Sequence, residues 1–137
     1  MADEGHITGL GGVFFSCRNV ESTRDWYREK LGIAIDPSWG GTAFTWREKG
    51  DPEHIGATIW APFSSENAYF APSKAEFMIN FRVRDLDGFL AHLKSHGVPQ
   101  IGEIDEQDYG RFAWILDPDG RKIELWEPKG EPREPIG

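Results

Sequence analysis

The sequence has little cysteine, no long hydrophobic run and few basic residues, and each shortage excludes a class of protein. Cys17 is the one cysteine among 137 residues, so no disulfide can form within the chain and a reducing compartment is expected. No stretch approaches the roughly 20 apolar residues that a membrane-spanning helix needs. The first residues lack the basic segment and apolar run of a secretion signal. We therefore expect a cytoplasmic protein that does not cross a membrane.

The shortage of basic residues gives the chain a negative charge. Fifteen Lys and Arg residues are outnumbered by 23 Asp and Glu residues, so the formal net charge is −8. A negative surface repels phosphate groups, which argues against nucleic acid or an anionic membrane as the partner. A cationic small molecule is favoured electrostatically, although a mildly acidic surface commonly serves only solubility.

Aromatic residues are plentiful, and they help to reveal an internal repeat. Six Trp and nine Phe residues in a 39% hydrophobic chain are enough for one packed domain. Residues that lie 66 positions apart match, including Phe15 with Phe81 and Trp60 with Trp126. A repeat of this length is a whole folding module, so the chain contains two copies of one unit.

Each copy shows the pattern of one strand, one helix and three further strands. Apolar runs rich in Val and Phe predict the strands, and a capping Asn or Asp before helically spaced apolar residues predicts each helix. The expected strands span 11–17, 33–35, 43–48 and 56–61, then 77–83, 100–104, 111–116 and 122–127. We predict a single domain of α+β class. Two tandem βαβββ modules (7–62 and 76–128) form curved mixed sheets around a cleft, with a linker over 63–75 and a loose tail over 129–137.

Side chains alternate along a strand, which divides the first and last strands of each module into two faces. One set is wholly apolar and is expected to pack against the helices: Val13, Phe15, Cys17, Ile59, Ile79, Phe81, Val83, Ile123 and Leu125. The other set mixes aromatic and polar groups: Gly12, Phe14, Ser16, Thr58, Trp60, Met78, Asn80, Arg82, Glu124 and Trp126. A mixed set in both copies predicts a ligand cleft with apolar walls, and the alternative is a sheet face half open to water.

Three motifs carry a resemblance to a known family: Asp117–Leu125 (DPDGRKIEL), Arg18–Tyr27 (RNVESTRDWY) and Lys30–Ile33 (KLGI). With the paired modules, they resemble the vicinal oxygen chelate superfamily. It includes glyoxalase I, extradiol dioxygenases, fosfomycin-resistance enzymes and bleomycin-resistance proteins. The resemblance covers nearly the whole chain and implies the superfamily fold. It also implies a homodimer, because related two-module chains commonly pair with a second copy.

The resemblance also indicates where a metal would bind. Metal-dependent members take His, Gln or Glu ligands from the first and last strands of each module, and the matching positions here are Gly12, Thr58, Met78 and Glu124. Only Glu124 suits a divalent ion, because glycine has no side chain, a threonine hydroxyl is a weak donor and a thioether is soft. We therefore predict no cofactor, and a divalent metal held by ligands from elsewhere in the chain is the alternative.

Two interpretations stay open for the candidate site residues. In an apolar cleft Glu124 would have a raised pKa and act as a general acid or base, or Arg82 would neutralise it in a structural ion pair. Trp60 and Trp126 would form the walls of a slot for a planar or cationic ligand, or would only fill space. Periodicity does not fix the facing of the aromatic residues on the middle strands, Phe44, Trp46, Phe112 and Trp114.

The leading functional prediction is a metal-free small-molecule-binding protein, similar in principle to the bleomycin-resistance branch, that sequesters an aromatic or cationic ligand. Its ligand-binding residues would be Phe14, Ser16, Thr58, Trp60, Met78, Asn80, Arg82 and Trp126. The alternative is an enzyme, a glyoxalase-like lyase or isomerase with Glu124 as its catalytic base. A third hypothesis is a partner-binding subunit whose cleft is vestigial.

Overall fold

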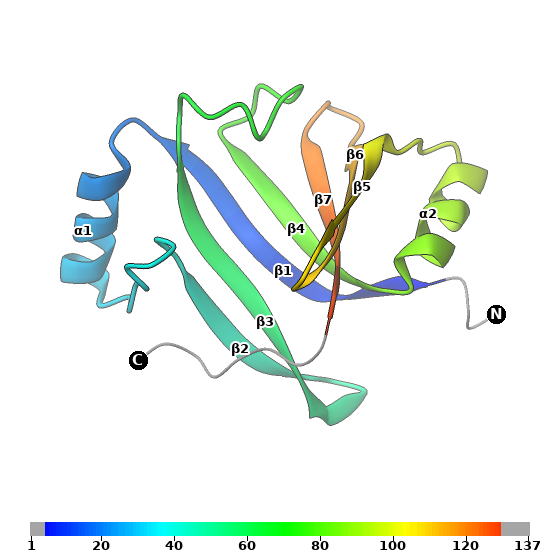
Figure 1. Cartoon of the computed structure of the whole chain (residues 1–137), viewed down its shortest axis with the longest axis horizontal. Helices are drawn as coiled ribbons and strands as arrows, with labels where there is room; N and C mark the ends of the chain where they lie inside the picture. The colour runs from blue at the N-terminus through cyan, green and yellow to red at the C-terminus, as the bar shows by residue number, and fades with distance from the viewer. Residues whose placement is uncertain (1–4, 130–137) are drawn as a thin grey trace.

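Residues 5–129 fold into one sheet of seven strands with two helices beside it (Figure 1). The structure is a computed structural model, and it describes these residues of the chain. The predicted tail beyond Lys129 lies outside the described residues. In chain order the elements are β1 (His6–Cys17), α1 (Val20–Leu31), β2 (Thr42–Glu48), β3 (Asp51–Ser64), β4 (Phe77–Arg84), α2 (Leu86–Ser95), β5 (Ile101–Gln107), β6 (Gly110–Leu116) and β7 (Lys122–Pro128).

The two modules join side by side in this sheet. The strand order is β2-β3-β1-β4-β7-β6-β5, and the first strands of the modules, β1 and β4, are antiparallel neighbours. Within each module the first and last strands run parallel, β1 with β3 and β4 with β7. The curved mixed sheet and its two helices confirm the predicted α+β fold class.

The two helices lie at the two ends of the sheet (Figure 1), and both pack on one face, here called the helix face. The register shows this, because Val13 pairs with both Trp60 and Ile79, and cross-strand partners share a face. At one end the ring of Tyr27 on α1 lies 5.8 Å from Phe15 and 4.8 Å from Trp60. At the other end α2 closes a core of Val83, Leu86, Ala113, Ile115 and Leu125, against which its predicted stripe of Phe89, Leu90 and Leu93 packs.

Each helix begins at the capping residue that the sequence predicts. Asn19 is extended, and its side chain accepts a hydrogen bond from the backbone N–H of Ser22 at 2.9 Å. Asp85 instead has a φ of 60°, in the left-handed region, and its side chain accepts from Gly88 N–H at 3.1 Å. Gly32 ends α1 with a φ of 73°. Neither helix of the described part has the length and apolar character needed to cross a membrane.

One predicted strand is absent from the first module. Residues 32–36, which include the strand expected over 33–35, have no strand assignment. The chain turns directly after them, at 37–39, where the carboxylate of Asp36 accepts hydrogen bonds from Ser38 N–H at 2.8 Å and from Trp39 Nε1 at 3.0 Å. That strand prediction is wrong. Among the described residues the first module is βαββ, and the second has the full βαβββ order.

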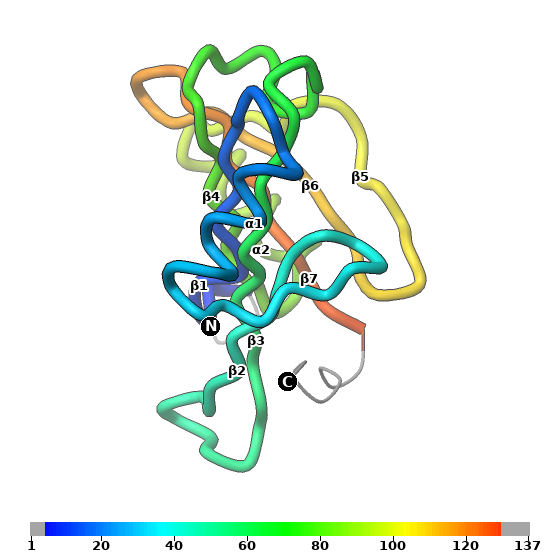
Figure 2. Tube along the Cα trace, turned by 90° about the vertical axis from the view of Figure 1, so that its left-hand side faces the viewer, coloured from blue at the N-terminus to red at the C-terminus, as the bar shows by residue number. Residues whose placement is uncertain are grey.

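The face opposite the helices, here called the open face, carries a second cluster. Its buried residues are Phe14, Ala61, Phe70 and Met78, with Ile59, Phe63 and Trp114 packed against them. Phe70 belongs to the β3–β4 connection, which lies at the same end of the sheet as the β6–β7 turn (Figures 1 and 2). The segment predicted as a linker therefore contributes to the packing of the open face.

Candidate functional site

Glu124 lies on β7 between β4 and β6, and its side chain is only 2% exposed. Asn80 Nδ2 donates a hydrogen bond to Oε1 of this carboxylate at 2.6 Å. Trp114 Nε1 donates to Oε2 at 2.9 Å, and the hydroxyl of Tyr69 donates to the same oxygen. Asn80 and Trp114 are the cross-strand partners of Glu124. Both oxygens of the carboxylate are thus bound by uncharged donors.

Burial and hydrogen bonding act on the Glu124 carboxyl in opposite directions. Burial raises its pKa above the usual range, and the bonds from Tyr69, Asn80 and Trp114 oppose that rise. Burial also raises the pKa of the Tyr69 phenol, and the charge of Glu124 adds to this effect, so the phenol remains a protonated donor. Neighbouring groups with perturbed pKa values are typical of functional sites.

The sequence did not place Tyr69, Trp114 and Lys122 in the site. Lys122 Nζ donates to the backbone oxygen of Tyr69 at 2.8 Å, and lies 5.2 Å from the Tyr69 ring centroid and 5.3 Å from that of Trp114. Burial lowers the pKa of its ammonium group, and the charge of Glu124 opposes this. Strand alternation could have placed Lys122 in the site, because it lies two residues before Glu124 and therefore on the same face. Tyr69 lies in the predicted linker, where no periodic pattern indicates its facing.

A second row of side chains crosses the open face beside Glu124. Arg82 is 3% exposed, and its guanidinium carbon lies 5.1 Å from the ring centroid of Trp126 and 5.6 Å from that of Trp46. The Trp126 ring is 6.0 Å from the Phe112 ring and nearly parallel to it, at 5°. Arg82 is therefore engaged with indole rings, and it is not among the three hydrogen-bond donors that hold Glu124.

Trp60 and Trp126 lie on opposite faces, so the prediction of a slot between these two residues is wrong. Trp60 is the partner of Val13, and its ring lies 5.4 Å from that of Phe15 on the helix face. Ile59 was expected on the helix face and instead packs in the open-face cluster. On β4 and β7 the predicted alternation is confirmed.

A difference in register between the modules causes this error. The β3 partner of Gly12 is Ile59, 47 positions later, whereas the β7 partner of Ile79 is Ile123, 44 positions later. The two registers differ by three positions, and an odd shift turns each side chain to the other face. Sequence matching across 66 positions therefore aligns Trp60 with Trp126 without giving them the same facing.

The other predicted ligand-binding residues lie beside the β3–β4 connection. Phe14 and Met78 are cross-strand partners, and both are buried. Ser16 follows Phe14 on the same face by alternation, and its backbone N–H donates to the oxygen of Glu76 at 2.7 Å. This part of the face is packed, and Tyr69 and Phe70 cover it.

The side chains at the family's metal positions do not fit a metal ion. Met78 is fully buried in the open-face cluster, and Gly12 offers no donor. The hydroxyl of Thr58 donates to a β1 carbonyl at 2.6 Å and accepts from an indole N–H at 2.8 Å, so it is engaged within the sheet. In residues 5–129 no three His, Cys, Asp or Glu side chains gather as ligands around Glu124 or elsewhere. A catalytic metal normally needs about three such ligands.

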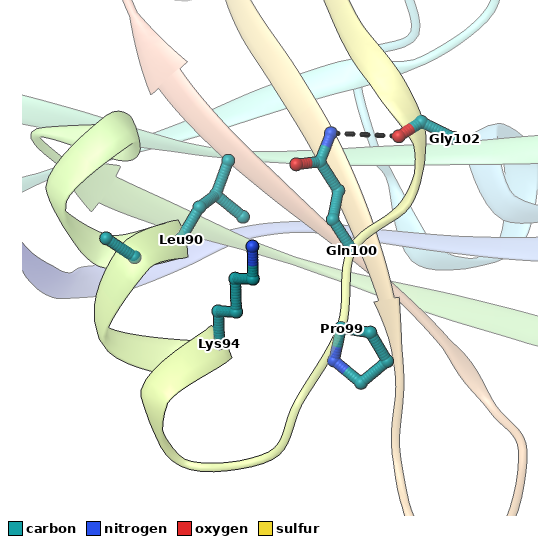
Figure 3. A pocket seen from close by; sticks show the side chains of 6 residues that line it. Leu90, Lys94, Pro99, Gln100 and Gly102 are labelled. Carbon is teal, nitrogen blue, oxygen red and sulfur yellow. Dashed lines mark hydrogen bonds between the residues drawn. The ribbon is translucent and has the colours of Figure 1, made fainter.

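Two hollows lie away from Glu124. The larger, about 460 Å³, lies between α2 and the segment leading into β5, and Figure 3 shows Leu90 and Lys94 of α2 across from Pro99 and Gln100. A smaller hollow of about 170 Å³ reaches Arg82. Glu124 lines neither of them. Its carboxylate is instead covered by side chains, Tyr69 among them.

Comparison with known proteins decides the family. The model of the Glyoxalase/Bleomycin resistance protein/Dioxygenase superfamily matches residues 5–125. The chain belongs to this superfamily. The resemblance inferred from the three sequence motifs is thereby confirmed. A curated relative, the uncharacterized protein YaeR of Escherichia coli strain K12, is 34% identical over 84 residues, which cover 58% of this chain and 65% of that protein. The match therefore spans less than two thirds of the relative's length.

Solved structures of the superfamily share the fold. Methylmalonyl-CoA epimerase from Mycobacterium tuberculosis is 24% identical, with 90% of each chain covered and a TM-score of 0.56. A variant of the Streptomyces coelicolor methylmalonyl-CoA epimerase is 17% identical, with 91% of this chain and all of that chain covered and a TM-score of 0.65. At these identities the likeness shows the fold alone.

Proposed function

We propose that this superfamily member binds a small planar molecule on the open face of its sheet, without a metal ion. The observation that carries the proposal is the aromatic row beside the buried carboxylate. The rings of Phe112 and Trp126 are nearly parallel and partly exposed, and Arg82 and Glu124 are fixed next to them. Partly exposed rings with a few fixed polar groups are typical of small-molecule sites.

The hydrogen bonding of Glu124 supports binding over catalysis. A general base must have an oxygen free to accept a proton from its substrate. Here three of the roughly four acceptor positions of a carboxylate are occupied, two on Oε2 by Tyr69 and Trp114 and one on Oε1 by Asn80. One position, on Oε1, is left. A carboxylate held in this way is suited to fixing the position of its neighbours.

Two tryptophans on opposite faces provide a matched test. Ligands found by quenching of tryptophan fluorescence should bind Trp126→Leu about tenfold more weakly, because a flat stacking surface is lost. Trp60→Leu makes the same change on the helix face and should leave the affinity unchanged. Equal losses in both variants, or none in either, would contradict binding at the open face.

Elemental analysis tests the metal-free part of the proposal. Protein purified without chelators should carry no stoichiometric divalent metal, because three of the four family positions offer no suitable ligand. A content near one zinc, nickel, iron or manganese per chain that is lost in Glu124→Ala would overturn it.

A second candidate function is an isomerase or lyase with Glu124 as its general base. It is favoured by the burial that raises the pKa of this carboxyl, as in many residues that transfer protons. Exchange of solvent deuterium into a bound compound, lost in Glu124→Gln with binding retained, would favour the enzyme over the binding protein.

A further inference from the structure

Tyr69 differs from the other two donors to Glu124 in where it comes from. Asn80 and Trp114 belong to the strands on either side of β7, and the sheet register fixes them next to the carboxylate. Tyr69 belongs to the connection between β3 and β4, and it is 37% exposed. It is the one of the three that can leave without opening the sheet.

The contacts of Tyr69 describe a binding place for an aromatic ring. Its ring is stacked on Phe63, with centroids 5.7 Å apart and planes at 24°, and meets the edge of Trp114 at 6.2 Å and 87°. Lys122 Nζ lies over it at 5.2 Å, and its hydroxyl donates to Glu124. The ring therefore has an aromatic wall on two sides, a cation on another and an acceptor at its polar end.

The neighbouring residue anchors the connection independently of Tyr69. Phe70 is 7% exposed and packs with Phe14 and Met78 in the open-face cluster. Rotation of the Tyr69 side chain towards solvent would leave that anchor in place. The hydrogen bond to Glu124 and the ring contacts would be lost, and a molecule with the same chemistry would restore them.

We propose that Tyr69 occupies the place of the ligand, and that the ligand is a neutral phenol whose ring and hydroxyl replace those of Tyr69. This inference rests on the proposed function and names its ligand class. The hydroxyl is required because the buried Glu124 oxygen would otherwise lose a donor, which is costly for a charged group. Neutrality is required because Lys122 lies over the ring.

The position of Lys122 argues against the cationic ligand that the acidic composition favours. A cationic ring in this place would lie about as close to the ammonium group as the Tyr69 ring does, 5.2 Å. Like charges in a partly buried site repel, whereas a cation attracts the face of a neutral, electron-rich ring. At the ring, Lys122 therefore opposes the preference for a cation that the net charge of −8 predicts, whereas the Glu124 carboxylate lies at the polar end.

The test compares three probes with one six-membered aromatic ring of the same size, by calorimetric titration of the full chain. They are 4-methylphenol, which is the side chain of tyrosine, 4-methylanisole, which cannot donate a hydrogen bond, and 1,4-dimethylpyridinium, which carries its positive charge in the ring. We expect the wild type to bind 4-methylphenol about tenfold more tightly than 4-methylanisole, the value of a hydrogen bond to a charged group. The cation should bind most weakly.

Two variants separate the roles of Tyr69 and Lys122. Tyr69→Phe keeps the ring and removes the competing hydroxyl, so its affinity for 4-methylphenol should rise about tenfold. Lys122→Met removes the cation, so 1,4-dimethylpyridinium should bind it more tightly than the wild type. An unchanged or reduced phenol affinity in Tyr69→Phe, or a wild type that prefers the cation, would overturn the inference.

The proposed function can survive that failure. If ring compounds bind and lose affinity in Trp126→Leu while Tyr69→Phe leaves them unchanged, the open face is a binding site and Tyr69 is not a substitute for the ligand. The Tyr69 ring contacts Phe63 and Trp114, whereas Trp126 stacks on Phe112. Probes whose affinity changes in Tyr69→Phe and is independent of Trp126 would therefore support the inference and exclude the Trp126 row as the site.

Discussion

Glu124 combines two opposing energetic effects in one side chain. Burying a carboxylate disfavours its charged form, and hydrogen bonds from fixed donors favour it. The balance remains on the side of burial, because the pKa of Glu124 is raised despite three donors. Its neighbour Asn80 is 1% exposed, and its Oδ1 has no hydrogen-bond partner within the described residues. A turned Asn80 amide could therefore accept a bond from a neutral side chain at position 124.

We expect Glu124→Gln to gain stability relative to the wild type as the pH rises. The raised native pKa means that the native state of the wild type binds a proton that the unfolded chain has lost. The stability owed to this proton is complete below the unfolded pKa of about 4.3 and is lost as the pH rises through the native pKa. Glutamine does not titrate. The difference in free energy of unfolding, wild type minus variant, should therefore fall with increasing pH.

Urea unfolding of the two proteins between about pH 4 and about pH 8 measures this difference. Hydrogen bonds lower the pKa values of Asp87, Glu106 and Asp117, so their contributions to stability are lost in the opposite direction, as the pH falls. They are present in both proteins and cancel in the comparison. A difference that grows with pH would show that the site favours the ionised carboxylate.

At the scale of elements, the pairing of strands decides which face of the sheet a side chain lies on, and alternation along one strand cannot decide this alone. The helices, their caps and the facing of β4 and β7 followed from period and composition. The facing of β3 did not, because it depends on how β3 pairs with β1. β1 is irregular, and its pairing with β4 shifts between Ile7 and Gly9 and between Leu10 and Gly12. Register is set by contacts between distant segments, and no local pattern around Trp60 contains it.

Tyr69 shows a second limit of prediction from the sequence. Its segment has the Ser, Asn and Pro content that predicts a connection, and it does connect β3 with β4. Its role arises because Lys122 and Glu124, more than 50 positions away, meet it on the open face. The predicted set of mixed-face residues could not include a side chain from a segment without periodicity.

The start of α2 offers a prediction at this scale. Asp85 both caps the helix and adopts a left-handed φ of 60°. Asp85→Ala removes the cap, worth about 1 kcal/mol, and places alanine in a conformation that costs roughly another 1–2 kcal/mol. We expect a loss of about 2 kcal/mol in the free energy of unfolding, measured in urea.

Asp85→Asn is the matched control for that change. Asparagine tolerates the left-handed region and caps helices as well as aspartate does, so the variant should be close to the wild type in stability. A comparable loss in both variants would show that the carboxylate charge matters more than the cap or the backbone conformation.

At the scale of the whole molecule, the helix face is only partly covered. α1 and α2 lie at its two ends, and β1 runs between them (Figure 1). Ile7 is 44% exposed and Leu10 is 40% exposed, and they pair with Val83 and Phe81 of the helix-face core. Apolar side chains that continue a core to the surface favour association with another protein surface.

We propose that a second copy covers this strip, as the resemblance to two-module dimers implies. Sedimentation at micromolar concentration should show about twice the 15.5 kDa mass of one chain. Leu10→Lys should shift the protein towards the monomer, because it places a charge in the apolar contact. Tyr109→Lys introduces the same charge at a residue that is 61% exposed in the β5–β6 turn, and it should leave the dimer intact. A monomeric wild type, or equal dissociation in both variants, would exclude this strip as the interface.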